Sequence, residues 1–427
     1  MTASPVEIDL TETERSVLSV VHAKGECTRP DISASLDVSK PTVSLAVSAL
    51  EEAGLIAPVR ARQGSLGRSA TVYAVAATAG WLLGLDIGST RVKVLARGLD
   101  GRQLRSMSES LGGTPGLRNE QILDLVSSLV SRTIRELAPV AGPLRAVGVA
   151  LPRVIPQYLN DESGSRTVGR PALAQILAAL DVDEGVPVLL ENNVNCAALA
   201  EMELGNAKAV DDFVFLQVGV GIGSGIVADR RVLRGARGGA GEVSSLPTGW
   251  PAKPENTDRF ALEHYLGANQ FLHRWTSSWD SQVGPVPASV AELFDYASAG
   301  VPTATAALDQ HSRDIGQLAL SLAAVLDPAL ILLGGGVGQN PHLLQGVRAV
   351  VQSVKPDVEV TTGSLGEEAT VEGAVALTLD HALSKLLGTR YKRRLDDRTT
   401  VVYASRATAA AVTDTDESPK ARGLTSV

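Results

Sequence analysis

An acidic residue beside a glycine turn is the first feature of the sequence that could do chemistry. The segment WLLGLDIGSTRVKVLARGLDGRQL, residues 81–104, has the pattern of an apolar strand, a turn and a second apolar strand. Asp86 lies at the end of the first strand, and Gly88, Ser89 and Thr90 follow in the turn. Backbone N–H groups and hydroxyls in such a turn can surround a phosphate, while the carboxylate holds a metal ion or water. Alone, the pattern is a weak indication of a nucleotide site.

Two further glycine-rich turns extend this pattern. In FVFLQVGVGIGSGIVADRRVL a strand runs into a turn that contains Gly219 and Gly221, and a second strand follows. This repeat of strand, turn and strand predicts a duplicated fold. In DPALILLGGGVGQN, Gly334 and Gly335 follow another apolar strand, and glycines there allow the backbone to approach a flat ligand such as a base.

A second kind of chemistry is indicated near the N-terminus, where short hydroxyl side chains and a lysine begin a helix. Apolar spacing predicts helices from Thr11 to about Lys24, over residues 29–36, and from residue 40 to Gly54. In the third helix Val43 and Val47 are expected to face inward. The N-cap of this helix and its outward residues are Ser39, Lys40, Thr42, Ser44 and Leu45. The N-terminal end of such a helix is what a helix-turn-helix protein places in the major groove of DNA.

The segment after this helix is predicted to be a β-hairpin that carries positive charge. Residues 55–75 alternate around the turn Gly-Ser-Leu-Gly, and they contain Arg60, Arg62 and Arg68. No Asp or Glu lies between Ala53 and Leu85, so the hairpin is expected to project a positive field toward phosphates or a minor groove. The alternative is that three helices and a hairpin form only a small packing module.

The bulk properties exclude several classes of protein. A length of 427 residues indicates two or three domains, and 44% hydrophobic but only 4% aromatic residues favour a globular α/β protein. The net charge of -8 argues against a generally basic nucleic-acid coat. The two cysteines, Cys27 and Cys196, indicate neither a disulfide framework nor a zinc cluster. With no secretion or membrane signal in the sequence, we expect a cytoplasmic protein.

From about residue 81 to residue 387 the motifs, taken in order, resemble the ROK family of repressors, open reading frames and kinases. They are LGLDIGSTRVKV, VGVALPRVI, LLENNVNCAALAEMELG, FLQVGVGIGSGIVADRRVLRGARGGAGEVSSLP, LDPALILLGGGVG and GEEATVEGAVAL. The resemblance implies a two-lobed, actin-like (ribonuclease-H-type) sugar-kinase-like fold with sugar bound between the lobes. Together with the predicted winged helix-turn-helix, the chain resembles the repressor branch of the family.

Two departures from the family's kinase pattern bear on catalysis. The position at which the resemblance implies a catalytic Asp is Asn193, and an amide cannot accept the proton of a sugar hydroxyl. General-base assistance, typically worth ~10²- to 10⁴-fold, would be lost. In the turn expected to bind phosphate, Val220 replaces a hydroxyl donor. We therefore expect no catalytic residue and a vestigial nucleotide site.

The resemblance also places sugar-contacting residues and a zinc site. Asn192, Glu242 and Glu263 match sugar-contacting positions, and Asn193 lies beside them. Helix capping is the alternative role for Asn192 and Asn195, and a turn carboxylate for Glu242. The family's zinc-ligating His corresponds to Ser245, and no cysteine follows in residues 249–267, so neither a metal nor a cofactor is expected.

These observations predict a DNA-binding regulator with three regions. Residues 1–77 would form the winged helix-turn-helix, residues 78–390 the effector and dimerisation domain, and residues 391–427 a disordered tail. The expected partners are an operator in double-stranded DNA, a sugar or sugar-phosphate effector, and further copies of the chain in a homodimer or homotetramer. Two hypotheses compete with this one: a sugar kinase that also binds DNA, and a scaffold whose kinase-like domain only dimerises.

Overall fold

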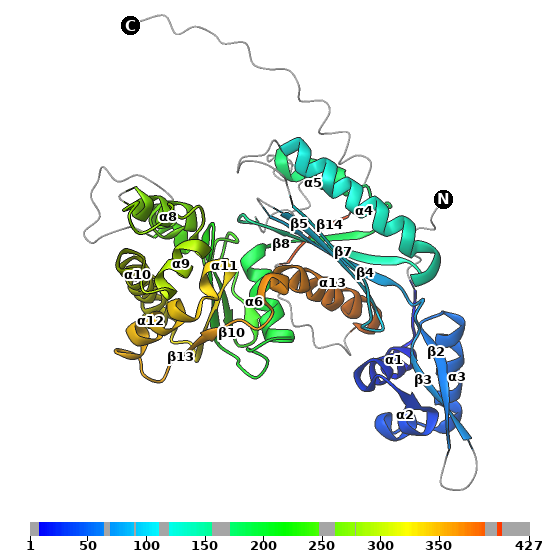
Figure 1. The fold of residues 1–427 in the computed structure, drawn as a ribbon. Coiled ribbons are helices and arrows are strands. Elements are labelled where there is room, and N and C mark those ends of the chain that lie inside the picture. The colour runs from blue at the N-terminus through cyan, green and yellow to red at the C-terminus, as the bar shows by residue number, and fades with distance from the viewer. Residues whose placement is uncertain are drawn as a thin grey trace, which may run out of the picture.

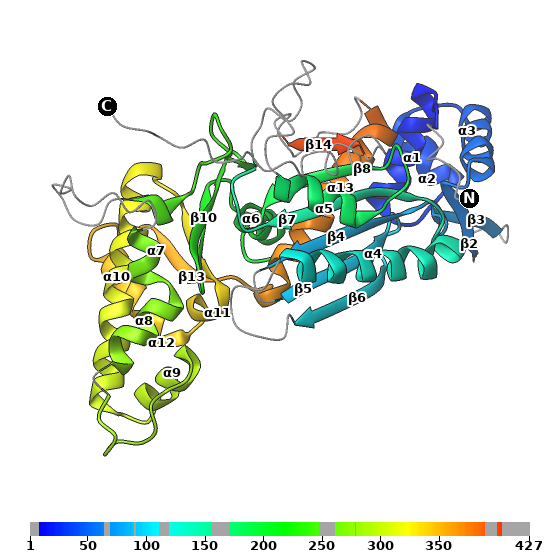
Figure 2. The ribbon, with the colours of Figure 1, turned by 90° about the horizontal axis from the view of Figure 1, so that it is seen from above.

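A computed structural model describes residues 8–63, 69–88, 91–110, 119–155, 171–246, 261–277, 279–388 and 399–403. Figure 1 shows a small N-terminal unit beside two larger lobes, and Figure 2 shows the same chain from above. Three β-sheets organise the described residues, one in each of these parts.

The N-terminal unit is a winged helix-turn-helix whose helices begin at strong N-caps. Thr11 and Thr28 each form a capping box, and the Ser39 side chain accepts from the backbone N–H of Thr42. The predicted helices are confirmed, as is the predicted hairpin. The elements are α1 (Glu12–Lys24), β1 (Cys27–Thr28), α2 (Arg29–Leu36), α3 (Lys40–Glu52), β2 (Ile56–Gln63) and β3 (Ser69–Val75), with sheet order β1-β3-β2.

The first lobe is a six-stranded sheet covered by helices on both faces. Helices α4 and α5 cover one face, and α13 packs on the other (Figure 1). Residues of β5 alternate accordingly, since Val92 and Val94 face α4 while Leu95 packs on α13. The sheet order is β14-β8-β7-β4-β5-β6. The bounds are β4 (Trp81–Ile87), β5 (Arg91–Gly98), β6 (Gln103–Ser110), α4 (Asn119–Ala141), β7 (Leu144–Leu151), α5 (Pro171–Leu180), β8 (Pro187–Asn192), α13 (Ala369–Leu387) and β14 (Thr400–Tyr403).

The second lobe repeats this plan around a five-stranded sheet. Helix α6 covers the side that faces the first lobe, while α10 and α12 lie on the outer side (Figure 2). The sheet order is β11-β10-β9-β12-β13. The bounds are α6 (Asn193–Glu203), β9 (Phe213–Val218), β10 (Ile222–Ala228), β11 (Arg231–Val232), η2 (Val243–Ser245), α7 (Ala261–Leu266), α8 (Ala268–Thr276), α9 (Val290–Ser298), α10 (Pro302–Leu326), β12 (Leu330–Gly334), α11 (Gly335–Gly338), α12 (Pro341–Gln352), β13 (Glu359–Thr362) and η3 (Gly366–Glu368).

The two large sheets share one topology. The hairpin β4–β5 is antiparallel, and β7 and β8 continue the sheet in parallel beyond β4. The hairpin β9–β10 is likewise antiparallel, and β12 and β13 continue in parallel beyond β9. This correspondence confirms the duplicated fold that the repeated glycine turns predicted.

Helices α6 and α13 pack against each other where the lobes join. A Cβ atom at Gly373 would collide with the backbone carbonyl oxygen of Cys196, so the two helices can approach only because residue 373 is glycine. Cys196 is fully buried in this contact, and Cys27 is buried in the N-terminal unit. The contact between α6 and α13 therefore sets how the lobes are joined.

The prediction of a disordered tail is wrong for residues 399–403. Strand β14 pairs antiparallel with β8, and Val401 lies opposite Leu189. Val401 and Val402 pack against different hydrophobic clusters on the two faces of the sheet. Four residues carry too little periodicity to indicate a strand, and the β8 edge that pairs with them lies about 210 residues away in the sequence.

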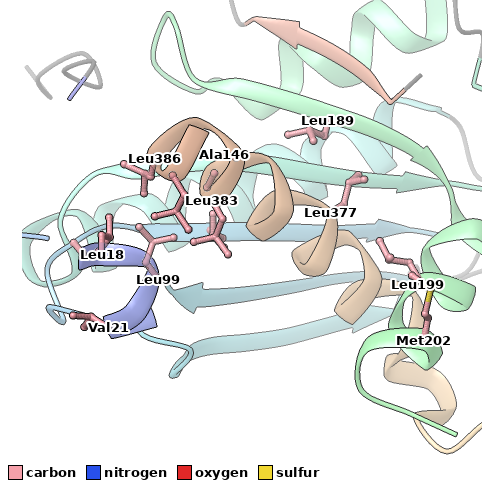
Figure 3. Close-up of a cluster of buried hydrophobic side chains, with 14 of the residues drawn as sticks. Leu18, Val21, Leu99, Ala146, Leu189, Leu199, Met202, Leu377, Leu383 and Leu386 are labelled. Carbon is pink, nitrogen blue, oxygen red and sulfur yellow. The ribbon is translucent and has the colours of Figure 1, made fainter. Parts of the chain in front are cut away.

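The N-terminal unit packs on the end of α13. Leu18 and Val21 of α1 share a buried cluster with Leu383 and Leu386 of α13 and with Leu99 (Figure 3). The cluster continues along α13 to Leu199 and Met202 of α6. One apolar core thus runs from the helix-turn-helix to the junction of the lobes.

Candidate functional sites

The start of α3 presents polar side chains to solvent, as predicted. Ser39, Lys40 and Thr42 are exposed, and Ser44 is half-buried. The Ser39 Oγ atom lies 2.7 Å from the Thr42 Oγ1 atom and also accepts from the Thr42 backbone N–H at 3.3 Å. These two hydroxyls therefore fix the helix start, whereas Leu45 projects outward with 75% of its surface exposed.

The wing arginines that the structure describes are paired with carboxylates. Arg60 donates from Nε and Nη2 to the Glu26 carboxylate at 2.9 and 2.6 Å, and Arg62 lies 3.6 Å from Asp31. The expected unopposed positive field is therefore wrong for these two residues, because acids that precede the wing in the sequence fold against it. Hydrogen bonds from Thr28, aided by Arg62, lower the pKa of Asp31. Arg68 lies outside the described residues.

These pairs are exposed, which limits their strength. More than half of each arginine side chain is accessible to solvent. Surface ion pairs contribute about 0–1 kcal/mol, so a DNA phosphate could compete for either guanidinium. Contact of Arg60 or Arg62 with an anion outside the chain would therefore require the guanidinium to exchange partners.

In the first lobe, Asp86 lies near the end of β4, where the sequence placed it. Burial raises the pKa of its carboxyl to about 6; nearby Lys93 opposes this shift and Glu368 adds to it. Gly88 donates its N–H to the Arg91 carbonyl and closes the turn. Ser89 and Thr90 lie outside the described residues.

Lys93 is a charged residue near this site that the sequence analysis missed. It pairs in register with Asp86 across the β4–β5 hairpin, and its side chain is buried. The Nζ atom donates to the Glu368 carboxylate at 2.8 Å and to the Glu367 carbonyl at 2.7 Å. A lysine inside the alternating apolar strand RVKVLA was the available signal. The protein thus supplies its own cation beside Asp86 and Glu368.

The residues around Asn193 hold the start of α6. Asn192 is the N-cap: its Oδ1 accepts from the N–H groups of Val194 and Asn195, and its Nδ2 donates to the Arg153 carbonyl at 3.2 Å. The capping alternative is therefore confirmed for Asn192. It is wrong for Asn195, whose buried side chain donates to Glu191 at 3.0 Å. Asn193 follows as the first residue of the helix and is half-buried.

A buried ion pair supports this arrangement. Arg234 donates from Nε to the Glu191 carboxylate at 2.7 Å, and its Nη2 lies 2.6 Å from the same oxygen. Both side chains are about 5% exposed. Because Glu191 directly precedes Asn192, and Arg234 belongs to the loop that leads to Glu242, the pair ties the two candidate ligand-binding segments together.

Glu242 and Glu263 come together beside the second glycine turn. Burial, reinforced by Glu263, raises the pKa of Glu242. The Glu263 Oε2 atom accepts from the Ile222 backbone N–H at 3.2 Å, directly after Gly221. A carboxylate therefore uses one N–H at the turn predicted to bind phosphate, and the neighbouring Val220 side chain is 55% exposed. Both features disfavour an anion in this turn.

The glycines of the third turn serve packing. A Cβ atom at Gly334 would collide with the Phe215 ring, and Gly335 has a φ of 79° and lies against the Val218 carbonyl. The close approach predicted for a ligand is therefore made by strand β9. Gly219 lies close to the backbone of Gly336, so the structure does bring the second and third turns together.

The described ranges lack two features that are typical of other classes of protein. These ranges contain no group of three or more His, Cys, Asp or Glu side chains placed to hold a metal ion. They also contain no helix long and apolar enough to cross a membrane.

The fold and these sites define a class: a winged helix-turn-helix joined to a two-lobed sugar-kinase-like domain. The family model described as "ROK family" matches residues 82–381, and the one described as "MarR family" matches residues 8–65. The chain belongs to the ROK family.

Similar proteins include both kinases and repressors. A beta-glucoside kinase of Klebsiella pneumoniae is 27% identical and covers 68% of this chain and 93% of its own. A xylose repressor of Caldicellulosiruptor bescii is 22% identical over 83% of this chain and 92% of its own.

Solved structures extend the similarity. A ROK family transcriptional regulator, described as a homolog of the E. coli MLC protein, superposes with a TM-score of 0.67 at 21% identity and covers 89% of this chain and 98% of its own. A ROK hexokinase from Thermus thermophilus has a TM-score of 0.53 at 30% identity over 70% of this chain and 97% of its own. The first match, over 89% of this chain, spans most of the described fold.

Proposed function

We propose that this protein is a sequence-specific DNA-binding transcriptional repressor of carbohydrate-related genes, with a sugar-kinase-like effector domain that does not catalyse. The proposal depends on one observation: a single chain joins a helix α3 whose first turn is exposed to a kinase-like domain in which Asn193 takes the position expected for the catalytic general base. Similarity to xylose repressors along most of the chain supports the repressor role.

The chemistry around Asn193 supports the loss of phosphoryl transfer. An amide has no basic site at neutral pH, so the attacking hydroxyl would keep its proton. Glu263 occupies an N–H at the phosphate turn, and its negative charge would repel a nucleotide phosphate. Binding could still occur near Asn193, Glu242 and Glu263, where a sugar would meet hydrogen-bonding groups. The proposed ligand is a sugar or sugar phosphate.

Regulation would follow from a change in the angle between lobes. A ligand shifts a conformational equilibrium only through different affinities for the two states. In the proposed homodimer or homotetramer, two α3 helices would bind half-sites that lie one helical turn of DNA apart, about 34–36 Å, or a multiple of it. A new angle between the lobes would change the separation of these helices, so that it no longer matches the half-site spacing. The effector would thereby change operator affinity.

Retention of genomic DNA by the purified full-length protein tests the DNA-binding role. We expect a small set of recovered sequences, and we expect the Lys40→Ala, Thr42→Ala double variant to lose their specific retention. Lys208→Ala, an exposed change outside the N-terminal unit, is the matched control. Recovery of the same set by the double variant, with its thermal unfolding unchanged, would contradict a reading role for α3. Repeating the retention with candidate sugars identifies the effector.

A second candidate function is a sugar kinase that also binds DNA. Similarity to the beta-glucoside kinase favours it, as do the carboxyl groups of Asp86 near the first glycine turn and of Glu242 near the second. A coupled assay of ATP turnover with a panel of hexoses decides between the two functions. We expect no turnover by the natural protein. Turnover that disappears in Asn193→Ala would establish the kinase.

A further inference from the structure

Leu45 lies unburied in the middle of a helix whose other large apolar residues are in the core. It is 75% exposed, whereas Val43, Val47 and Leu50 of the same helix are fully buried. Exposed Pro41 and Ser48 lie four residues before and three residues after it, on the same helix face. The exposed Leu45 side chain does not stabilise the N-terminal unit on its own. We therefore look for a partner outside the chain that this side chain contacts.

The remaining groups on this face offer little hydrogen-bond readout of bases. The Ser39 and Thr42 hydroxyls contact each other and cap the helix. Residues 40–52, KPTVSLAVSALEE, contain no Arg, Asn, Gln or His. The bidentate pairs by which Asn or Gln reads adenine are therefore not available from α3, and Lys40 is the one residue of this helix that could read guanine.

One base feature of the major groove matches an apolar side chain. Thymine carries a C5-methyl group there, and apolar residues recognise it by direct contact. The two described wing arginines do not replace this readout, because Arg60 and Arg62 are paired with acids and are suited to phosphates instead. Recognition of thymine by α3 is thus left to Leu45, beside the hydrogen bonds that Lys40 and the nearby serines can make.

We propose that Leu45 determines operator specificity by packing on the C5-methyl group of a thymine in the major groove. This inference rests on the proposed DNA-binding function and adds the base that the helix reads. It places a thymine at one position of each half-site, contacted near the middle of α3.

Replacing thymine with deoxyuridine removes only the methyl group, and this makes a direct test. A duplex is first selected from a random-sequence library by the full-length protein, and each thymine is then changed to deoxyuridine in turn. We expect one position per half-site at which the dissociation constant rises about fourfold, as for the loss of one buried methyl-sized group. For Leu45→Ala the same replacement should have no effect.

Val325→Ala is the matched control, because Val325 is 82% exposed on α10 in the second lobe. This variant should retain the natural protein's sensitivity to deoxyuridine. Leu45→Ala should unfold at an unchanged temperature, since the side chain removed is largely in solvent.

The outcomes distinguish failure of the inference about Leu45 from failure of the proposed DNA-binding function. Equal sensitivity of Leu45→Ala and the natural protein at every thymine would overturn the inference, as would insensitivity of the natural protein throughout. In both cases selection of the duplex would still support DNA binding. Failure to select any duplex would instead overturn the proposed function, and the inference with it.

Discussion

Arg15 of α1 donates a hydrogen bond of 2.8 Å from Nη1 to the backbone carbonyl oxygen of Leu386, in the last turn of α13. The carbonyls at a helix C-terminus have no partners within the helix, and they carry partial negative charge. A guanidinium donates hydrogen bonds to these carbonyl oxygens and also places a positive charge beside them. The same Nη1 atom also donates to the Lys385 carbonyl at 3.0 Å. The DNA-binding unit is thus attached to the helix that begins beside Lys93.

Arg15→Ala should loosen this attachment. The variant loses two charged hydrogen bonds to α13 and a third to the Leu10 carbonyl, but it keeps the apolar contacts of Leu18 and Val21. We therefore expect a loss of about 1–2 kcal/mol in the stability of the contact. Hydrogen exchange should become faster in α1 and in the last turn of α13, with the second lobe unchanged. Arg102→Ala, an exposed arginine in the β5–β6 turn, is the control. Unchanged exchange in α1 would show that the apolar contact alone holds the unit.

Removing one member of the Glu191–Arg234 pair should strongly destabilise the protein. Each single change, Glu191→Gln or Arg234→Met, leaves the other charge buried, and such losses typically cost about 3–5 kcal/mol. The double variant should recover part of this loss, because no unpaired charge remains. Urea unfolding of the natural protein, the two single variants and the double variant gives the coupling free energy between Glu191 and Arg234. If each single variant loses less than about 1 kcal/mol in its free energy of unfolding, the pair behaves as an exposed ion pair and the prediction is wrong.

Asp86 should make stability depend on pH between about 4 and 6. Its pKa is about 6 in the folded protein and near 3.8 when unperturbed, so folding favours the protonated form. The stabilising contribution is full below pH 3.8 and is lost as the pH rises through 6. Asp86→Asn lacks this titration. We therefore compare the free energy of unfolding of the variant with that of the natural protein at each pH. The variant's value minus the natural protein's value should rise by a few kcal/mol from pH 4 to pH 7, at about 1.4 kcal/mol per unit of pKa difference.

Urea unfolding of both proteins at several pH values provides the measurement. Asp124→Asn, a change on α4 remote from the glycine turns, is the control for general effects of charge. A difference between Asp86→Asn and the natural protein that stays constant with pH would show that Asp86 is ionised in the folded state throughout this range.

Local signals in the sequence were sufficient for the helices and for the repeat. Ser39 with Pro41 marks the start of α3, and the paired strand–glycine–strand segments predict a duplicated fold. These features depend on residues within a few positions of one another. The same is true of Asn193, whose chemical meaning depends on its side chain and its place in a motif.

Contacts between distant segments could not be read in the same way. Glu26 and Asp31 neutralise the wing because β1 pairs with β3, a pairing that no local pattern specifies. Lys93 pairs with Glu368 across a separation of 275 positions in the sequence. Glu263 likewise accepts from the Ile222 N–H at the glycine turn, 41 residues away in the sequence. Long-range pairing of charges therefore accounts for most of the differences.

Glu26→Gln should strengthen DNA binding. The change frees the Arg60 guanidinium, which now donates twice to the Glu26 carboxylate, and adds one cation available to phosphates. We expect affinity for duplex DNA to rise about two- to fivefold at low salt and the slope of log K against log salt to steepen by up to about 0.9. Because phosphate contacts carry no sequence information, operator and random duplexes should gain alike.

Glu120→Gln makes the same change in net charge at an exposed position on α4, far from the wing, and should leave both quantities unchanged. Fluorescence anisotropy over a series of salt concentrations measures affinity and slope together. A gain shared equally by both variants would mean that net charge alone is responsible. A gain confined to Glu26→Gln but absent from Glu26→Gln, Arg60→Ala would assign it to the released arginine, because only that side chain distinguishes the two proteins.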